Sequence, residues 1–133
     1  MEWGTLTVRG ERVEELLSEV TGPTGAMERT RYRADRFCVV AWERWDSWRT
    51  GTDLMVAVVM ELLDRETCQV AVFAGGGGSG LTGRDWTVTS VAAEHLLGAE
   101  HSAEAAAFGE AVVDVEDACE ALDLTLDVGD DGA

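Results

Sequence analysis

Three apolar runs follow one another closely between residues 37 and 74, and they restrict the fold more than any other feature of the sequence. They span Phe37 to Trp45, Asp53 to Leu63 and Thr67 to Ala74. Only a loop over Asp46–Asp53 and a turn, Asp64-Arg65-Glu66, separate them. Connections this short join antiparallel neighbours, whereas parallel strands need a crossover of about a dozen residues or more. The runs therefore predict an antiparallel meander.

Strands are also predicted on both sides of these runs. Trp3 to Arg9 alternates apolar and polar residues, as a half-buried strand does. Met27 to Ala34 alternates as well, and its three arginines share one face. Between Trp86 and Val91 the threonines favour a strand over a helix. Leu124 to Val128 is a candidate for a short last strand.

Two segments carry apolar residues at helical spacing. Glu11 to Val20 has acids in its first turn and is followed by Gly22 and Pro23, which end helices. Ser102 to Leu124 is the longer segment, with Ser102 as its expected N-cap. Its apolar stripe consists of Ala105, Phe108, Val112, Val115, Cys119 and Leu122.

The predicted order is β-α-β-β-β-β-β-α, which indicates an α+β fold: a meander sheet in two layers with the long C-terminal helix. In element order alone it resembles a shortened helix-grip or TBP-like arrangement. We expect one domain over residues 1–128 and an acidic, disordered tail over residues 129–133.

The charge balance indicates a particular cellular setting. The chain has 26 acidic and 10 basic residues and a net charge of −16, and lysine, asparagine and isoleucine are absent. This composition resembles that of proteins from salt-accumulating halophiles, where molar salt screens self-repulsion. The alternative is an acidic mimic or a chaperone-like protein from a mesophile.

The remaining composition predicts a cytoplasmic protein that does not enter a membrane. Leu54 to Met60 is the longest uncharged apolar run, far below the roughly 20 residues of a membrane span. The first residues lack the basic and apolar regions of an export signal. Cys38, Cys68 and Cys119 are widely spaced and odd in number, which suits buried free thiols in a reducing compartment.

A glycine tract after the last apolar run is the main functional candidate. Gly75, Gly76, Gly77, Gly78 and Gly80 surround Ser79. Such a tract is either a flexible hairpin tip or a loop that lets a ligand approach backbone amides. The tract also contains the spacings of dinucleotide and P-loop motifs, but Arg84 and Asp85 replace the lysine and hydroxyl residue of a P-loop, and no βαβ unit surrounds it. We therefore predict no nucleotide cofactor.

The meander places alternate loops at the same end of the sheet. These are the loops over Thr21–Gly25, Asp46–Asp53 and Gly75–Gly83. We expect a binding site there for a small anionic or apolar ligand, without catalysis. Its contact residues would be the glycine tract (Gly75 to Gly78, Ser79 and Gly80) together with Trp45, Trp48, Arg49 and Arg84.

A second cluster combines arginines with aromatic residues. Six of the ten arginines fall between Arg29 and Arg49, among Tyr32, Trp42, Trp45 and Trp48. Arginine and aromatic faces suit phosphate or nucleobase recognition. Pairing of the arginines with surface carboxylates and packing of the tryptophans in the core is the favoured interpretation. The strongly negative charge makes a nucleic-acid partner an unfavoured alternative.

Two other functions remain open. If Glu43 and Glu61 faced inward from their strands, they would form a carboxylate pair suited to acid–base catalysis, but the favoured interpretation is that they face solvent at the strand ends. Alternatively, an aromatic sheet face or an edge strand would form a homodimer. His95 and His101 lack the spacing of a helical zinc site, so we predict no metal.

Overall fold

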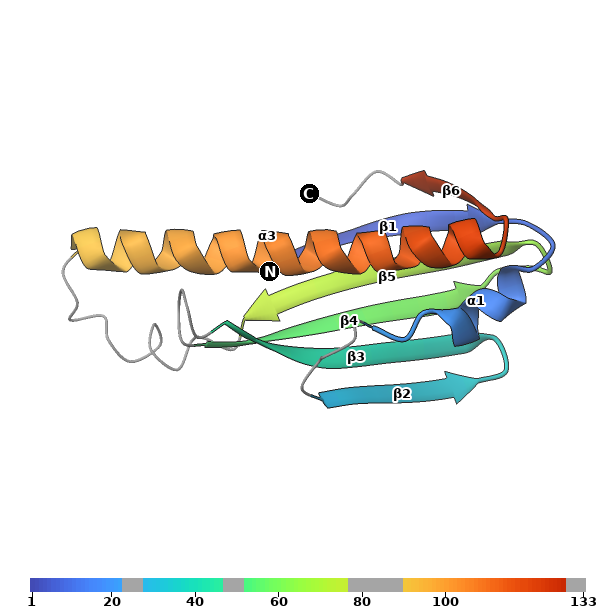
Figure 1. Cartoon of the computed structure of the whole chain (residues 1–133), viewed down its shortest axis with the longest axis horizontal. Coiled ribbons are helices and arrows are strands. Elements are labelled where there is room, and N and C mark those ends of the chain that lie inside the picture. Colours follow the sequence, from blue (N-terminus) through green and yellow to red (C-terminus); the bar gives the residue numbers. More distant parts are fainter. Residues whose placement is uncertain (23–27, 47–51, 77–89, 129–133) are drawn as a thin grey trace.

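The computed structural model describes residues 1–22, 28–46, 52–76 and 90–128. Over these residues it is an α+β fold, in which a six-stranded antiparallel sheet carries two helices (Figure 1). The elements are β1 (Glu2–Arg9), α1 (Val13–Glu19), β2 (Glu28–Ala34), β3 (Phe37–Asp46), β4 (Thr52–Leu62), β5 (Thr67–Gly76), α3 (Ser90–Ala121) and β6 (Thr125–Val128).

The strands lie in the order β2-β3-β4-β5-β1-β6. The predicted meander accounts for β2 to β5. The first strand then pairs with the fifth, in a register that sets Leu6 opposite Val70. β6 pairs with the other side of β1, from Leu6 to Arg9. β1 is therefore an inner strand over its second half.

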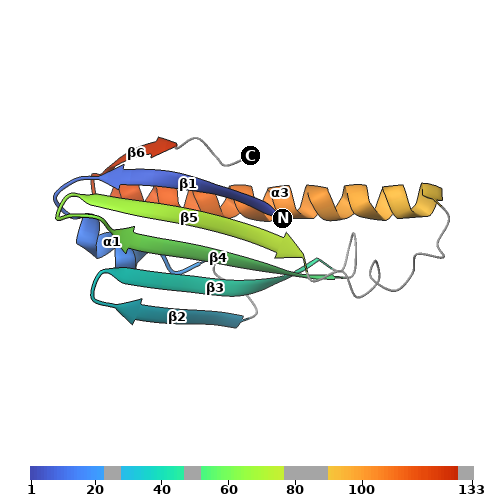
Figure 2. The same cartoon turned by 180° about the vertical axis from the view of Figure 1, so that it is seen from behind.

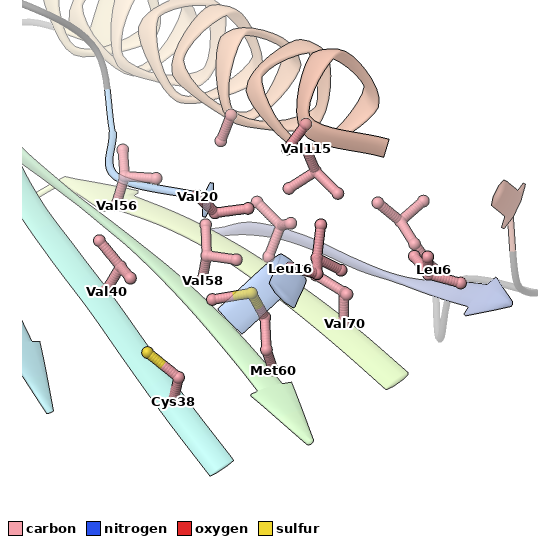
Figure 3. Close-up of a cluster of buried hydrophobic side chains, with 14 of the residues drawn as sticks. Leu6, Leu16, Val20, Cys38, Val40, Val56, Val58, Met60, Val70 and Val115 are labelled. Carbon is pink, nitrogen blue, oxygen red and sulfur yellow. The ribbon is translucent and has the colours of Figure 1, made fainter. Parts of the chain in front are cut away.

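The two described helices, α1 and α3, lie on the same face of the sheet. Figure 2 shows the strands uncovered in front of α3, while Figure 1 shows α1 and α3 in front of the strands. In the central parts of β1, β3, β4 and β5, residues with even numbers point toward the helices and are buried, such as Val8, Val40, Val58 and Val70. Figure 3 shows Val40, Val58 and Val70 on the side of the sheet that faces Leu16 of α1 and Val115 of α3. We call the opposite side of the sheet the outer face.

The long helix differs from the prediction at its start and in its buried stripe. It begins at Ser90, so Ser102 lies inside the helix and is not its N-cap. Ser90 and Val91 are helical and not the end of a strand, whereas residues 86–89 of that predicted strand lie outside the described residues. Ala105 is exposed, and the stripe against the sheet consists mainly of small residues: Ala103, Ala107, Ala111, Val115, Ala118, Cys119 and Leu122.

The shorter helix starts two residues later than predicted and is held at its C-terminal end by β2. The guanidinium of Arg31 donates hydrogen bonds to the carbonyls of Leu17 and Val20, the last turn and the C-cap of α1. These carbonyls carry the negative end of the helix dipole, so a cation there is favourable. Arg31 thus fixes α1 on the sheet.

The connection after α1 turns sharply at Gly22. This glycine has φ of 85°, and a Cβ at its position would lie 2.9 Å from Cε3 of Trp42. Its N–H donates to Oδ2 of Asp114 on α3, at 3.2 Å. Desolvation raises the pKa of this carboxyl. The chain therefore passes between α3 and the Trp42 ring at a point where only glycine is accommodated without adjustment.

Candidate functional site

The strand ends that flank the predicted loops lie at one end of the sheet, as the meander requires. Asp46 of β3 pairs with Thr52 of β4, and Leu54 pairs with Gly76 at the end of β5. Glu2 of β1 pairs with Ala74 at the same end. We call this the glycine end.

Only part of the predicted site falls within the described residues. Gly75 and Gly76 form the last residues of β5, and the backbone of Trp45 pairs with Asp53. The side chain of Trp45 lies outside what the structure describes. So do the remaining predicted contacts, namely Gly77, Gly78, Ser79, Gly80, Arg84, Trp48 and Arg49.

A groove of about 450 Å³ lies at the glycine end, next to the two described glycines. Pockets that hold small molecules have volumes of this order. Most of its wall is apolar, and the outer face contributes Met55, Ala57 and Phe73 to it. Among the described residues, its lining consists of Met1, Met55, Ala57, Phe73, Gly75, Gly76 and Glu104.

The Met1 side chain packs against Gly75 at the edge of the groove. A Cβ there would lie 2.9 Å from Cε of Met1, the flexible end of that side chain. Beside the groove, the Trp3 and Phe73 rings stack with centroids 6.2 Å apart and planes inclined by 16°. Apolar and aromatic groups thus dominate the surroundings of the groove.

Glu104 is the charged side chain of the groove, and sequence reasoning did not select it. It comes from α3 and is only 8% exposed. Its Oε2 lies 2.8 Å from the α-amino group of Met1. A buried carboxylate is costly unless a cation or hydrogen bonds compensate it, so this position in the groove favours positive charge. Nothing in the local sequence distinguishes Glu104 from the other acids of this helix, because its position in the groove depends on how α3 packs against the sheet.

The ion pair makes stability depend on pH in a defined direction. The hydrogen bond and the charge of Glu104 raise the pKa of the Met1 ammonium above 8.0. A raised pKa in the folded state stabilises the fold fully below the unfolded value, and this contribution is lost as pH rises through the folded value. For a chain that begins at Met1, we expect thermal stability to fall from pH 8 to pH 10 by more in the wild type than in Glu104→Gln. Equal losses of thermal stability in the two proteins, measured by differential scanning calorimetry, would contradict this coupling. Titration of the thiols over this pH range affects both proteins alike and cancels in the comparison.

The favoured interpretation that Glu43 and Glu61 face solvent is confirmed, and the alternative of an inward carboxylate pair is wrong. Glu43 and Glu61 are both exposed, and their register with Met55 and Phe37 places them on the outer face. They do not face a cavity between sheet and helices. An inward carboxylate pair is therefore not available for acid–base chemistry.

Four of the described arginines between Arg29 and Arg44 make contacts that hold the fold together. Arg33 donates to Oγ of Ser18 at 3.1 Å, and Arg36 donates to the Leu63 carbonyl at 2.9 Å. Arg44 pairs with Glu110 of α3 at 3.0 Å. Most of these partners, including those of Arg31, are backbone carbonyls or a hydroxyl, and not the surface carboxylates that were expected. Trp42 is buried in the core, as predicted.

All three thiols are buried, and those of Cys68 and Cys119 are unsuited to nucleophilic chemistry. Burial raises the pKa of Cys68 to about 12 and that of Cys119 to about 11. Within residues 1–22, 28–46, 52–76 and 90–128, no group of three or more His, Cys, Asp or Glu side chains is placed to hold a metal ion. None of the helices that the structure describes combines the length and apolar character needed to cross a membrane.

Comparison of the chain with known protein families, with curated proteins and with solved structures finds no match.

Proposed function

We propose that this protein is a non-catalytic binding module of a salt-rich cytoplasm, and that the groove at the glycine end takes a small apolar ligand carrying a cationic group. The observation that carries the proposal is the Glu104 carboxylate, which is 8% exposed in a groove otherwise lined mainly by apolar groups. Such a pairing of apolar walls with one charged group gives both affinity and orientation.

The negative charge of Glu104 favours a cationic ligand over the anionic ligand that was considered from the sequence. A carboxylate ligand would meet Glu104 and the field of a molecule with a net charge of −16. A primary ammonium or guanidinium would instead replace the Met1 ammonium as the partner of Glu104. Met1 is 74% exposed, so its ion pair is screened by solvent, and an ammonium held inside the groove would form the stronger pair with Glu104. The apolar portion of the ligand adds to the gain by covering Met55 and Phe73.

Calorimetric titration with three probes of equal chain length tests this proposal. We expect n-hexylammonium to bind more tightly than n-hexanol, and n-hexanoate to bind at least about tenfold more weakly than n-hexylammonium, a difference of about 1.4 kcal/mol. In Glu104→Gln, the affinity for the ammonium should fall by about tenfold while that for the alcohol stays unchanged.

A matched variant separates the groove from the general acidity of the surface. Glu110 lies on the same helix as Glu104 and is solvent-exposed. Glu110→Gln removes the same charge and should leave hexylammonium binding unchanged. Equal binding of hexanoate and hexylammonium, or equal effects of the two substitutions, would refute the proposal.

A further inference from the structure

The outer face of the sheet carries apolar side chains that belong to no described core. Its members on β1 to β5 are Trp3, Tyr32, Phe37, Val39, Ala41, Met55, Ala57, Val59, Ala71 and Phe73. Trp3 is 40%, Met55 58% and Tyr32 64% exposed. Neither α1 nor α3 lies on this side (Figure 2). Large contiguous apolar patches of this kind mark interaction sites.

The strand register arranges these residues in two uncharged central rows. One row runs Tyr32, Val39, Val59, Ala71 and Thr5 across the sheet. The next runs Thr30, Ala41, Ala57, Phe73 and Trp3. Glu43 and Glu61 lie beyond the two rows, at opposite ends of the face. An apolar centre with charges at the rim is the anatomy of a protein interface.

We infer that a second copy of this chain covers the outer face, so that the protein is a face-to-face dimer. The shape of the face is suited to another sheet: alanines and valines occupy the middle, while aromatic rings lie toward β1 and β2. Two sheets pack about 10 Å apart, with large side chains of one over small side chains of the other.

The size of the face also meets the requirement of a dimer. The two rows and their neighbours cross β2, β3, β4, β5 and β1. With strands about 4.8 Å apart and residues about 3.4 Å apart, the face measures roughly 24 by 20 Å. Two such faces bury on the order of 1,000 Å² together, the lower limit for a specific interface.

The charge of the chain favours no other occupant of the central rows, and it sets the salt condition under which the dimer forms. A basic partner would find no carboxylate in the central rows, so charge complementarity does not favour it there. A second copy adds another net charge of −16, and this repulsion is screened in molar salt. The dimer should therefore strengthen with salt.

The inferred dimer would also complete the groove. Met55, Ala57 and Phe73 belong both to the outer face and to the groove lining. A second copy on this face would cover the open side of the groove. The dimer is measured without any ligand, so its failure and that of the proposed ligand are distinguishable.

Sedimentation equilibrium at increasing protein concentration tests the inference. In 2 M KCl we expect a mass of about 29 kDa, twice the 14.3 kDa of one chain, and weaker association in 0.15 M KCl. Val59→Glu, at the centre of the face, should give the monomer mass. Val113→Glu is the matched control, because Val113 is 53% exposed on α3, and it should leave the dimer intact.

A milder variant keeps the test decisive if Val59→Glu does not fold. Met55→Lys changes a side chain at the border of the face that is already 58% exposed, and it should weaken the dimer at least about tenfold. A wild type that stays monomeric at millimolar concentration in both salts would overturn the inference. So would equal association of Met55→Lys, Val113→Glu and the wild type.

Discussion

Gly22→Ala should lower the free energy of unfolding by about 2–4 kcal/mol, although it adds only one methyl group. The first cause is the backbone, since φ of 85° strains any residue with a Cβ. The second is Trp42, whose ring carbon Cε3 would lie 2.9 Å from the new methyl group and is held in the core. Urea unfolding followed by circular dichroism measures the loss.

The matched control is Gly109→Ala in the middle of α3. Nothing lies within 4 Å of a Cβ at this position, and a helical glycine costs stability relative to alanine. This variant should therefore gain about 0.5–1 kcal/mol. Combining Gly22→Ala with Trp42→Leu should reduce the cost at Gly22 to the backbone part of about 1–2 kcal/mol. Equal stability changes at Gly22 and Gly109 would contradict the account.

Arg31→Ala should destabilise the protein by about 2–3 kcal/mol. The substitution removes the donor to the carbonyls of Leu17 and Val20, leaves both acceptors partly buried, and releases the C-terminal end of α1 from β2. Arg31→Lys should restore less than half of the loss, because an ammonium cannot bond both carbonyls as the planar fork does. In Arg31→Ala, native-state hydrogen exchange should accelerate relative to the wild type, and more so in α1 than in β4 or β5.

Arg33→Ala is the comparison for this residue. Arg33 lies on the same strand and the same face, but it donates to a hydroxyl at the surface and to a carbonyl of its own strand. We expect it to cost less than about 1 kcal/mol. If Arg31→Ala and Arg33→Ala lowered the free energy of unfolding equally, the proposed anchoring of α1 by Arg31 would be contradicted.

The strands were predictable because their signals are local. Alternation placed β1 and β2 within a residue of their observed starts, and the short turn at residues 64–66 set the pairing of β4 with β5. The run Phe37 to Ala41, apolar at every position, already indicated that both sides of β3 carry apolar groups. One side proved to be the core and the other the outer face.

The long helix was less predictable because alanine carries little pattern. Its buried stripe is mostly Ala103, Ala107 and Ala111, and these residues are indistinguishable in the sequence from exposed Ala105 and Ala106. The bulkier Phe108 and Val112 were predicted to lie in the buried stripe, but they lie beside it and are only half-buried. A stripe of small residues lets the helix lie close to the sheet, which only the packed structure reveals.

The candidate site was predictable in position but not in chemistry. Antiparallel geometry placed Gly75 and Gly76 at the right end of the sheet. The carboxylate of Glu104 comes from a helix almost thirty residues further on, and no spacing rule connects the two. For the arginines, the grouping was predictable but the surroundings were not. Alternation placed Arg29, Arg31 and Arg33 on one face of β2, but the sequence does not reveal that this face lies under α1.

The place of β1 between β5 and β6 also governs the order in which the chain can assemble. Both neighbours lie downstream, at Thr67–Gly76 and Thr125–Val128, so β1 is synthesised long before either partner exists. The hairpins from β2 to β5 close over short loops, whereas docking β1 closes a loop of some sixty residues and is slower. During translation, the earliest strand of the sheet is therefore among the last to find its place.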